Sequence, residues 1–572
     1  MDEMKTTVSF QPMHTRLAEM LLHPYVLFCL IPLLVYLPQG FNIGPVNDGW
    51  IMLATTLKPH GLRVPDTTRI FGSFARSVGI LISSDSFVGW QSVLLVLTIL
   101  RGIIFYELGR LFLPGNRLFA LVFGLCALFH PLDNMFFWVD ASGIDLAFLA
   151  LGLSCLCALA YLENGKRSYL VGAVLLQVVT AFSYTAFMLL MFAIPVGAWI
   201  LRRMEGQRKS PLYLAEICTG PFVLLVVQAY LAARGVGREG KVLDLHAAKV
   251  LSGFDAQVHH LLPNLASVFE HFQPQYLLIV IAVSILGLGV AFLVERQTRE
   301  AEAVEQPKRD IRFYAVLVLG LLALALVSYL PFAVSDVRNG DRRQMFAAGI
   351  FICTAVLVPF FCCLRGQPWP RRLQVVLVAV LALFVCATGL MKREPWVAQY
   401  RHQERLLAAV AQLVPDPPEQ ATIVVQLHSR PQSKLLAGFY NRKVAFMTAL
   451  RFMYGRVAQD ADKHEEKLGI RGTFAPVRGE PFSFSKDSLT VQNALHPKNS
   501  LTVPYAQLFV VDYPAEGEPR LLTRTELQAL APAGTDLSDY KPDAVAAAPD
   551  KRSIACTMFE RRYRPDYCFP VR

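Results

Sequence analysis

The sequence predicts a mainly α-helical membrane protein: a bundle of transmembrane helices followed by a small α/β domain. Of its 572 residues, 54% are hydrophobic and only 17% are charged, and the mean hydropathy is +0.40. A chain of this composition carries more apolar surface than an ordinary water-soluble core can hold. Apolar stretches recur over the first two thirds of the chain, whereas the last third resembles a soluble domain in composition. We therefore expect a membrane domain over residues 1–390 and a soluble domain over 391–572.

The predicted membrane spans are close to, or a little below, the length of about 20 residues that crosses a hydrocarbon layer. The stretch 169–200 is too long for one helix, and its flanks, 166–167 and 202–209, are both basic and therefore expected in the cytoplasm. It must cross twice, with a turn near Ser183-Tyr184-Thr185, which gives the bundle about eleven crossings. The predicted apolar stretches are 24–38, 88–105, 118–130, 146–162, 169–200, 217–232, 276–294, 313–332, 345–363 and 373–390.

The distribution of Lys and Arg predicts how the chain is oriented. Cytoplasmic loops of membrane proteins are enriched in these residues, and the basic loops 110–117, 296–312 and 365–372 all fall on one side. The amino terminus is therefore expected in the cytoplasm and the domain 391–572 outside it. The first span lacks a signal-peptide cleavage pattern and is expected to be a retained anchor. We expect a multi-pass protein of a bacterial inner membrane with a periplasmic tail domain.

The tail is predicted to be a small extracytoplasmic α/β domain. Leu and Ala recur with helical spacing over 401–414, and the runs 421–427 and 507–513 have the length and Val content of buried strands. Cys556 and Cys568 are isolated from the other cysteines, which lie in or beside apolar spans. In an oxidising compartment this pair is expected to form a disulfide, and two unpaired thiols are the alternative.

The net charge of +11 calls for an explanation. Nucleic acid is the usual partner of a basic chain, but much of this charge lies in loops predicted to be cytoplasmic, where it orients the protein and meets anionic lipid headgroups. The sequence contains no glycine-rich nucleotide fingerprint, no His-Glu-x-x-His motif and no paired Cys-x-x-Cys pattern. We therefore expect membrane lipids as partners and no nucleic acid. A metal or other cofactor is not indicated.

The first external loop contains the leading candidate for chemistry, Asp48. It lies in the sequence Asn47-Asp48-Gly49-Trp50, a few residues beyond the first span, where a side chain can point into the bundle. Ionisable groups at such places are often functional. Of the other charges in this loop, Arg69 is expected to support the site. The whole set also suits a loop that is simply soluble: Lys58, His60, Arg63, Asp66, Arg69, Arg76 and Asp85.

The second external turn, 131–145, combines carboxylates with aromatic residues. The Phe-Phe-Trp run at 136–138 is typical of an aromatic belt at the membrane interface. Asp145 begins the next span and is expected to cap that helix. Asp140 has no such role, so we expect it to face a polar cavity and bind substrate, with Asp133 in a supporting position.

A late external turn, 335–343, carries Arg338, Arg342 and Arg343 on the side where few basic residues are expected. The planar fork of an arginine matches phosphate oxygens. We therefore expect these side chains to hold a lipid-linked phosphate at the outer leaflet. Ion pairs with the two aspartates of the same turn are the alternative.

Together these features resemble the GT-C membrane glycosyltransferases, which move sugars from polyprenyl-phosphate carriers on the extracytoplasmic face. The resemblance rests on Asp48, the many short spans, the close helix pair around Ser183-Tyr184-Thr185, the arginine turn and the soluble C-terminal domain. It implies that Asp48 is the catalytic base, that the arginine turn holds the donor phosphate, and that a glycan, lipid or protein accepts the sugar. Relatives often have paired acids in the first loop, whereas here Asn47 precedes Asp48, which suits a single general base.

Two other classes of protein stay open. A transporter or flippase of lipid-linked saccharides would use the same arginines and aromatic residues without a base. Transporters often contain internal repeats and polar residues in mid-span, and this chain has no clear repeat and few mid-span charges beyond Arg101 and Glu107. A non-catalytic protein that displays the tail domain in the cell envelope would need no site at all.

Overall fold

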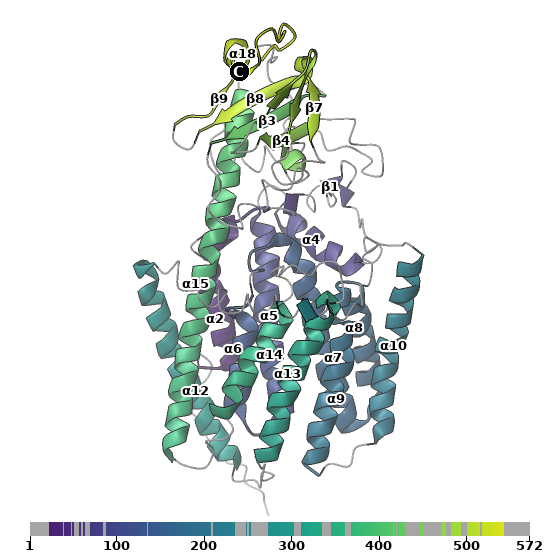
Figure 1. Cartoon of the computed structure of the whole chain (residues 1–572). Coiled ribbons are helices and arrows are strands. Elements are labelled where there is room, and N and C mark those ends of the chain that lie inside the picture. The colour runs from purple at the N-terminus through teal and green to yellow at the C-terminus, as the bar shows by residue number, and fades with distance from the viewer. Residues whose placement is uncertain are drawn as a thin grey trace, which may run out of the picture.

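In the computed structural model, the chain forms a bundle of long apolar helices with a small α/β domain at one end (Figure 1). The structure describes residues 22–37, 39–46, 49–50, 57–58, 61–62, 69–83, 87–133, 135–206, 210–234, 248, 251–252, 255, 273–302, 311–333, 345–360, 368–415, 417–418, 420–428, 446–450, 471–475, 482–492, 500–514 and 517–542.

Most helices of the bundle overlap the predicted apolar stretches. The helices are α2 (Pro24–Tyr36), α4 (Ile70–Ile82), α5 (Val88–Phe112), α6 (Arg117–Leu128), α7 (Ser142–Asn164), α8 (Arg167–Ala181), α9 (Met188–Met204), α10 (Pro211–Ala233), α12 (Leu277–Glu302), α13 (Ile311–Ala333), α14 (Met345–Val358) and α15 (Pro368–Leu413). Short 3-10 turns precede several of them: η2 (Val139–Ala141), η3 (Thr185–Phe187) and η4 (Pro274–Tyr276).

Among the described residues, 7 helices are long and apolar enough to cross a membrane. This is the pattern of a multi-pass membrane protein. Four shorter apolar helices, α2, α6, α8 and α14, lie among them. The stretch 169–200 is indeed two helices, α8 and α9, and the chain leaves the helical conformation between Ala181 and Thr185, where the turn was predicted.

Local sequence signals set the ends of several helices. Pro24 lies in the first turn of α2, where its missing backbone N–H costs nothing. The Asn116 side chain accepts a hydrogen bond of 3.0 Å from the backbone N–H of Phe119 and caps the start of α6. Gly165 ends α7 with a φ of 66°, a left-handed conformation that glycine adopts without strain.

The helix α4 was not predicted, because its segment was assigned to an external loop. It packs on α5 and α7 at the end of the bundle that faces the α/β domain (Figure 1). Two glycines allow the close approach to α7, since a Cβ on Gly143 would lie 2.9 Å from the Cα of Gly72. The indole N–H of Trp90 on α5 donates to the backbone carbonyl of Arg76 at 2.9 Å. Part of the predicted first loop is therefore a helix fixed to the bundle.

The helix α15 differs most from the sequence prediction. We expected a span that ends at residue 390 and a separate helix over 401–414, but the structure has one continuous helix of 46 residues. At 1.5 Å per residue such a helix is about 70 Å long, more than twice the hydrocarbon thickness of about 30 Å. It therefore continues beyond the bundle and reaches the α/β domain (Figure 1).

The described part of the tail forms an α/β domain, as predicted. Its main sheet has the order β4-β3-β8-β9, in which β3 pairs in parallel with both β4 and β8. The two predicted strands are β3 (Thr422–Leu427) and β8 (Leu508–Tyr513). The other strands of the tail are β4 (Arg471–Ala475), β5 (Phe482–Phe484), β6 (Ser488–Val491), β7 (Leu501–Pro504) and β9 (Arg520–Leu521), with helix α18 (Arg524–Leu530) near the end.

Side chains of β3 alternate between two cores, as the pleat of a strand requires. Ile423 and Val425 belong to the core that continues along α15 into the bundle. Val424 points to the opposite face, where it packs in a second core with side chains of β5, β6, β7 and α18. The sheet is therefore buried on both faces, and one face ties the domain to α15. A two-residue hairpin in the first loop, β1 (Leu57–Lys58) with β2 (Gly61–Leu62), lies apart from these sheets.

Candidate functional site

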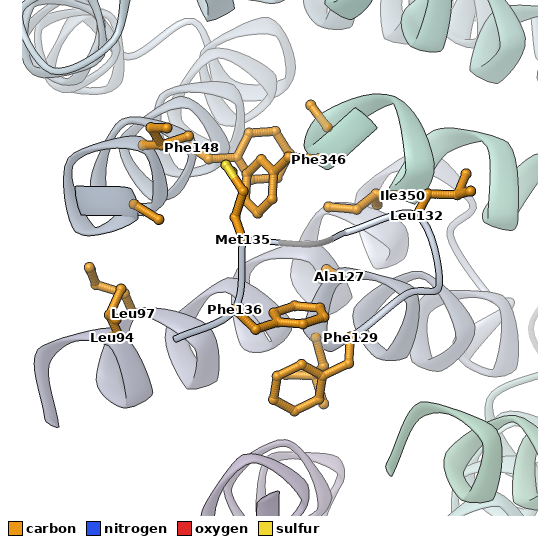
Figure 2. Close-up of a cluster of buried hydrophobic side chains, with 14 of the residues drawn as sticks. Leu94, Leu97, Ala127, Phe129, Leu132, Met135, Phe136, Phe148, Phe346 and Ile350 are labelled. Atoms are coloured by element: carbon orange, nitrogen blue, oxygen red, sulfur yellow. The ribbon is translucent and has the colours of Figure 1, made fainter. Parts of the chain in front are cut away.

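A buried, non-helical segment between α6 and α7 is the most unusual described part of the bundle. The helix α6 has only 12 residues, or about 18 Å, so it ends well short of a full membrane crossing. The chain then folds back among the helices before η2 and α7 begin. Figure 2 shows this segment surrounded by helices, with Phe136 against Phe129 and Met135 towards Phe148 and Phe346.

The aromatic residues 136–138 do not form the interfacial belt that we predicted. Phe136, Phe137 and Trp138 are only 6%, 1% and 8% exposed, respectively. The ring centroids of Phe129 and Phe136 lie 4.8 Å apart, and those of Phe137 and Tyr36 lie 4.7 Å apart. Because α6 is short, these rings are carried into the protein interior instead of lying at its edge.

Irregular backbone inside a membrane bundle requires internal hydrogen-bond partners, and Arg101 supplies several of them. Its Nε donates to the carbonyl of Ala127 at 2.6 Å and its Nη2 to the carbonyl of Leu128 at 2.7 Å. These are among the last carbonyls of α6, which have no partner within the helix. A cation at this end also complements the helix dipole. Arg101 therefore caps α6 from its position on α5.

Lys392 on α15 supplies hydrogen-bond donors to backbone carbonyls of the residues that follow α6. Its ammonium donates to the carbonyls of Pro131 and Asp133, the latter at 2.7 Å. The ring of His130 contacts the carbonyl of Phe346, with 2.9 Å between Nε2 and the oxygen. Side chains from α5 and α15 therefore hold the buried segment from two sides.

Two carboxylates balance these cations. Oδ1 of Asp145 accepts from Nη1 of Arg101 at 2.5 Å, and Oδ2 of Asp133 lies 3.9 Å from Nη2 of the same guanidinium. Asp145 is therefore not the helix cap that we predicted: it lies in the first turn of α7, and the N-cap position is Ala141, which makes no side-chain capping bond. The reason is that the buried charge of Arg101 requires a nearby counter-charge.

The backbone of this segment is also strained. Phe137 has a φ of 65°, in the left-handed region that a bulky side chain rarely adopts. The amide of Gln91 on α5 donates to the Phe137 carbonyl at 3.2 Å and to the Ile43 carbonyl at 2.8 Å. Gln91 therefore joins the buried segment to the first loop. Strained backbone of this kind is concentrated at functional sites.

The predicted base, Asp48, lies outside the described residues, but residues on both sides of it are described. Val46 and Trp50 are buried, and the backbone N–H of Gly49 donates to the Val46 carbonyl at 3.0 Å. The indole N–H of Trp50 donates to Oε1 of Gln403 on α15 at 3.1 Å. The chain around residue 48 is therefore attached to α15 at the end of the bundle near the α/β domain.

The arginine turn, with Arg338, Arg342 and Arg343, also lies outside the described residues, between the ends of α13 and α14. Its neighbours are described. The ring of Phe332 lies 6.4 Å from that of Tyr184, and the guanidinium carbon of Arg69 lies 5.4 Å above the Tyr184 ring. On the other side of the turn, Phe346 lies beneath Arg101, with 4.7 Å between the guanidinium carbon and the ring centroid.

The remaining predicted site residues are only partly described. Asp140 lies in η2, directly after the buried segment, and its side chain is not among those that the structure describes. Cys556, Cys568, Asp66 and Asp85 lie outside the described residues. In the described part of the chain, no group of three or more His, Cys, Asp or Glu side chains is arranged to hold a metal ion.

The sequence reasoning overlooked Arg101 and Lys392 as parts of one site. The available signal was an ionisable residue within or directly after an apolar stretch, which in a membrane bundle faces the interior.

Comparison of the chain with models of known protein families and with curated protein sequences finds no match.

Proposed function

We propose that this protein is a membrane glycosyltransferase that moves a sugar from a polyprenyl-phosphate donor to a glycan, lipid or protein acceptor on the extracytoplasmic face. The observation that supports this most is a set of contacts at one end of the bundle. Trp50 donates a hydrogen bond to Gln403, and Gln91 joins the first loop to the buried segment. The Tyr184 ring lies under the guanidinium of Arg69 and 6.4 Å from the Phe332 ring. These contacts involve residues close in sequence to Asp48, Asp140 and the arginine turn, which supports a shared site.

The proposal includes an orientation. Each of the four shorter apolar helices is counted as one crossing beside the 7 long ones, which gives about eleven crossings with the amino terminus in the cytoplasm. Exposed arginines such as Arg110 and Arg203 then lie at the cytoplasmic end. The end that carries the α/β domain faces the periplasm of a bacterial inner membrane.

The proposed reaction is an inverting displacement. Asp48 takes the proton of an acceptor hydroxyl, whose oxygen forms a bond to the anomeric carbon of the donor sugar. The bond from that carbon to the phosphate oxygen breaks, and the polyprenyl phosphate leaves with the electron pair. Arg338, Arg342 and Arg343 stabilise the negative charge of the leaving phosphate. Asp140 binds hydroxyl groups of the sugar or acceptor. Arg69 and Asp133 support the site, Asp133 through the rigid segment that it helps to hold.

The test is a transfer assay with purified protein and a panel of radiolabelled polyprenyl-phosphate sugars. Removal of a general base lowers a rate by about 10² to 10⁴-fold, so Asp48→Asn should lose turnover while the protein inserts and accumulates normally. Asp66→Asn and Asp85→Asn in the same loop are matched controls and should be milder. Full activity of Asp48→Asn would contradict the assignment of the base. Movement of a lipid-linked saccharide across vesicles without any transfer would favour a transporter instead.

A further inference from the structure

A cavity lined only by hydrophobic residues and glycines lies in the bundle, and none of its lining residues belongs to the candidate functional site. Its volume is about 250 Å³, and it is bounded by α9, α13 and the ends of α5 and α6 that meet at their connecting turn. Phe119 and Phe123 form its buried floor, whereas Ile200 and Ala323 on its rim are exposed. It is therefore a groove that opens outward from the bundle between α9 and α13.

Two glycines leave this groove open. Gly197 on α9 and Gly320 on α13 both line it, and a Cβ added at either position would meet no atom within 4 Å. The other lining residues are hydrophobic. An open apolar groove on the membrane-facing side of a bundle suits a hydrocarbon chain, because a chain regains there the dispersion contacts that an empty space lacks.

Basic side chains lie at one end of the groove. Arg203 follows the lining residue Ile200 by three positions on α9, and Arg312 precedes the lining residue Val316 by four on α13, so each lies on the same helix face as the groove. Both arginines are exposed. The guanidinium carbon of Arg203 lies 4.5 Å above the Trp199 ring, which holds the side chain at this end.

We propose that this groove binds an anionic phospholipid, with one acyl chain between α9 and α13 and its phosphate on Arg203 and Arg312. Charge selects the headgroup, because anionic lipids are attracted to basic residues at the membrane surface, and an arginine fork matches phosphate oxygens. With the orientation given above, this lipid belongs to the cytoplasmic leaflet. The site thus differs from that of the polyprenyl-phosphate donor, whose phosphate is assigned to the opposite end of the bundle.

The experiment measures thermal unfolding of the purified full-length protein in neutral detergent, with phosphatidylglycerol or phosphatidylcholine added. A ligand that binds only the folded state raises the melting temperature by mass action. We expect phosphatidylglycerol to raise it more than phosphatidylcholine does. Gly320→Leu places a side chain in the groove and should abolish the lipid-dependent rise. Ala315→Leu, on an exposed position of the same helix, is the matched control and should keep it.

The headgroup is tested separately. The double variant Arg203→Gln, Arg312→Gln should lose the preference for phosphatidylglycerol. Native mass spectrometry should show one phosphatidylglycerol retained by the wild type and by Ala315→Leu, and none by Gly320→Leu. Equal lipid responses of Gly320→Leu and wild type would overturn the groove, and equal responses to the two lipids would overturn the anionic headgroup. Displacement of the bound lipid by a neutral polyprenol would instead assign the groove to the isoprenoid tail of the donor. No readout depends on sugar transfer, so failure here is distinct from failure of the proposed enzyme activity.

Discussion

The two halves of the helix bundle differ in how deeply some of their basic side chains are buried. In the half away from the α/β domain, Arg110 is 45% exposed and pairs with Glu107 at 2.9 Å, and Arg202, which is 12% exposed, pairs with Glu163. In the other half, Arg101 and Arg393 are 1% and 0% exposed. Arg393 donates to the carbonyl of Val35 near the end of α2 at 2.9 Å and to the hydroxyl of Tyr276 at 2.7 Å.

The difference separates two kinds of cation in this protein. Under the proposed orientation, surface arginines act as orientation signals, since the positive-inside rule concerns loops near the ends of spans. The buried cations Arg101, Lys392 and Arg393 all donate to backbone carbonyls at helix ends or in the irregular segment. They compensate for helices that are too short to end at the membrane surface. The buried cations are therefore not counted as orientation signals.

The largest expected effect tests this comparison directly. Arg101→Leu leaves Asp145 without its counter-charge and removes the donors to the last carbonyls of α6. Breaking a buried pair in this way typically costs about 3 to 5 kcal/mol. Arg110→Leu, on the same helix, removes only an exposed pair worth about 0 to 1 kcal/mol. Unfolding in mixed detergent micelles, followed by circular dichroism, measures both.

A paired substitution sharpens the result. Arg101→Leu with Asp145→Leu removes both charges, and replacing a buried pair by apolar side chains is often close to neutral. The double variant should therefore be more stable than Arg101→Leu alone. A loss of stability in Arg101→Leu no greater than that in Arg110→Leu would show that the two halves of the bundle use their cations in the same way.

The next effect concerns a cation outside the described residues. Charge-assisted hydrogen bonds contribute about 1.5 to 3 kcal/mol, so Arg338→Ala should weaken the apparent affinity for the polyprenyl-phosphate donor by about 10 to 100-fold. Arg110→Ala, in the other half of the bundle, is the control and should leave donor use unchanged. Donor titrations in the transfer assay give both values. Unchanged donor affinity in a normally accumulating Arg338→Ala variant would favour the ion pairs with Asp336 and Asp341.

Sequence reasoning predicted the elements whose signal is local. Apolar stretches such as 313–332 and 276–294 became α13 and α12, and two Val-rich runs became the paired strands β3 and β8. It failed where distant residues decide the structure. The sequence near residues 129–138 does not predict that Arg101 and Lys392 bond to this part of the chain, because both partners are distant in sequence. Arg101 is 26 residues before Ala127, and Lys392 is 261 residues after Pro131. We predicted the end of a span at residue 390 from the polar residues that follow it. Those residues are compatible with a helix, so α15 continues through them.

The smallest expected effect concerns the contact between Trp50 and Gln403, where the first loop meets α15. Gln403→Leu removes one neutral hydrogen bond, which contributes about 0.5 to 1.5 kcal/mol to stability. The proposed function adds a second consequence, since Trp50 follows Asp48 by two residues and a loosened loop misplaces the base. We therefore expect the maximal transfer rate to fall while the Michaelis constant for the donor changes little. Trp50→Phe removes the same bond from the other side, so the double variant should lose no more activity than either single variant. Additive losses in this cycle, or a fall in stability without any fall in rate, would show that the contact only fastens the loop to the helix.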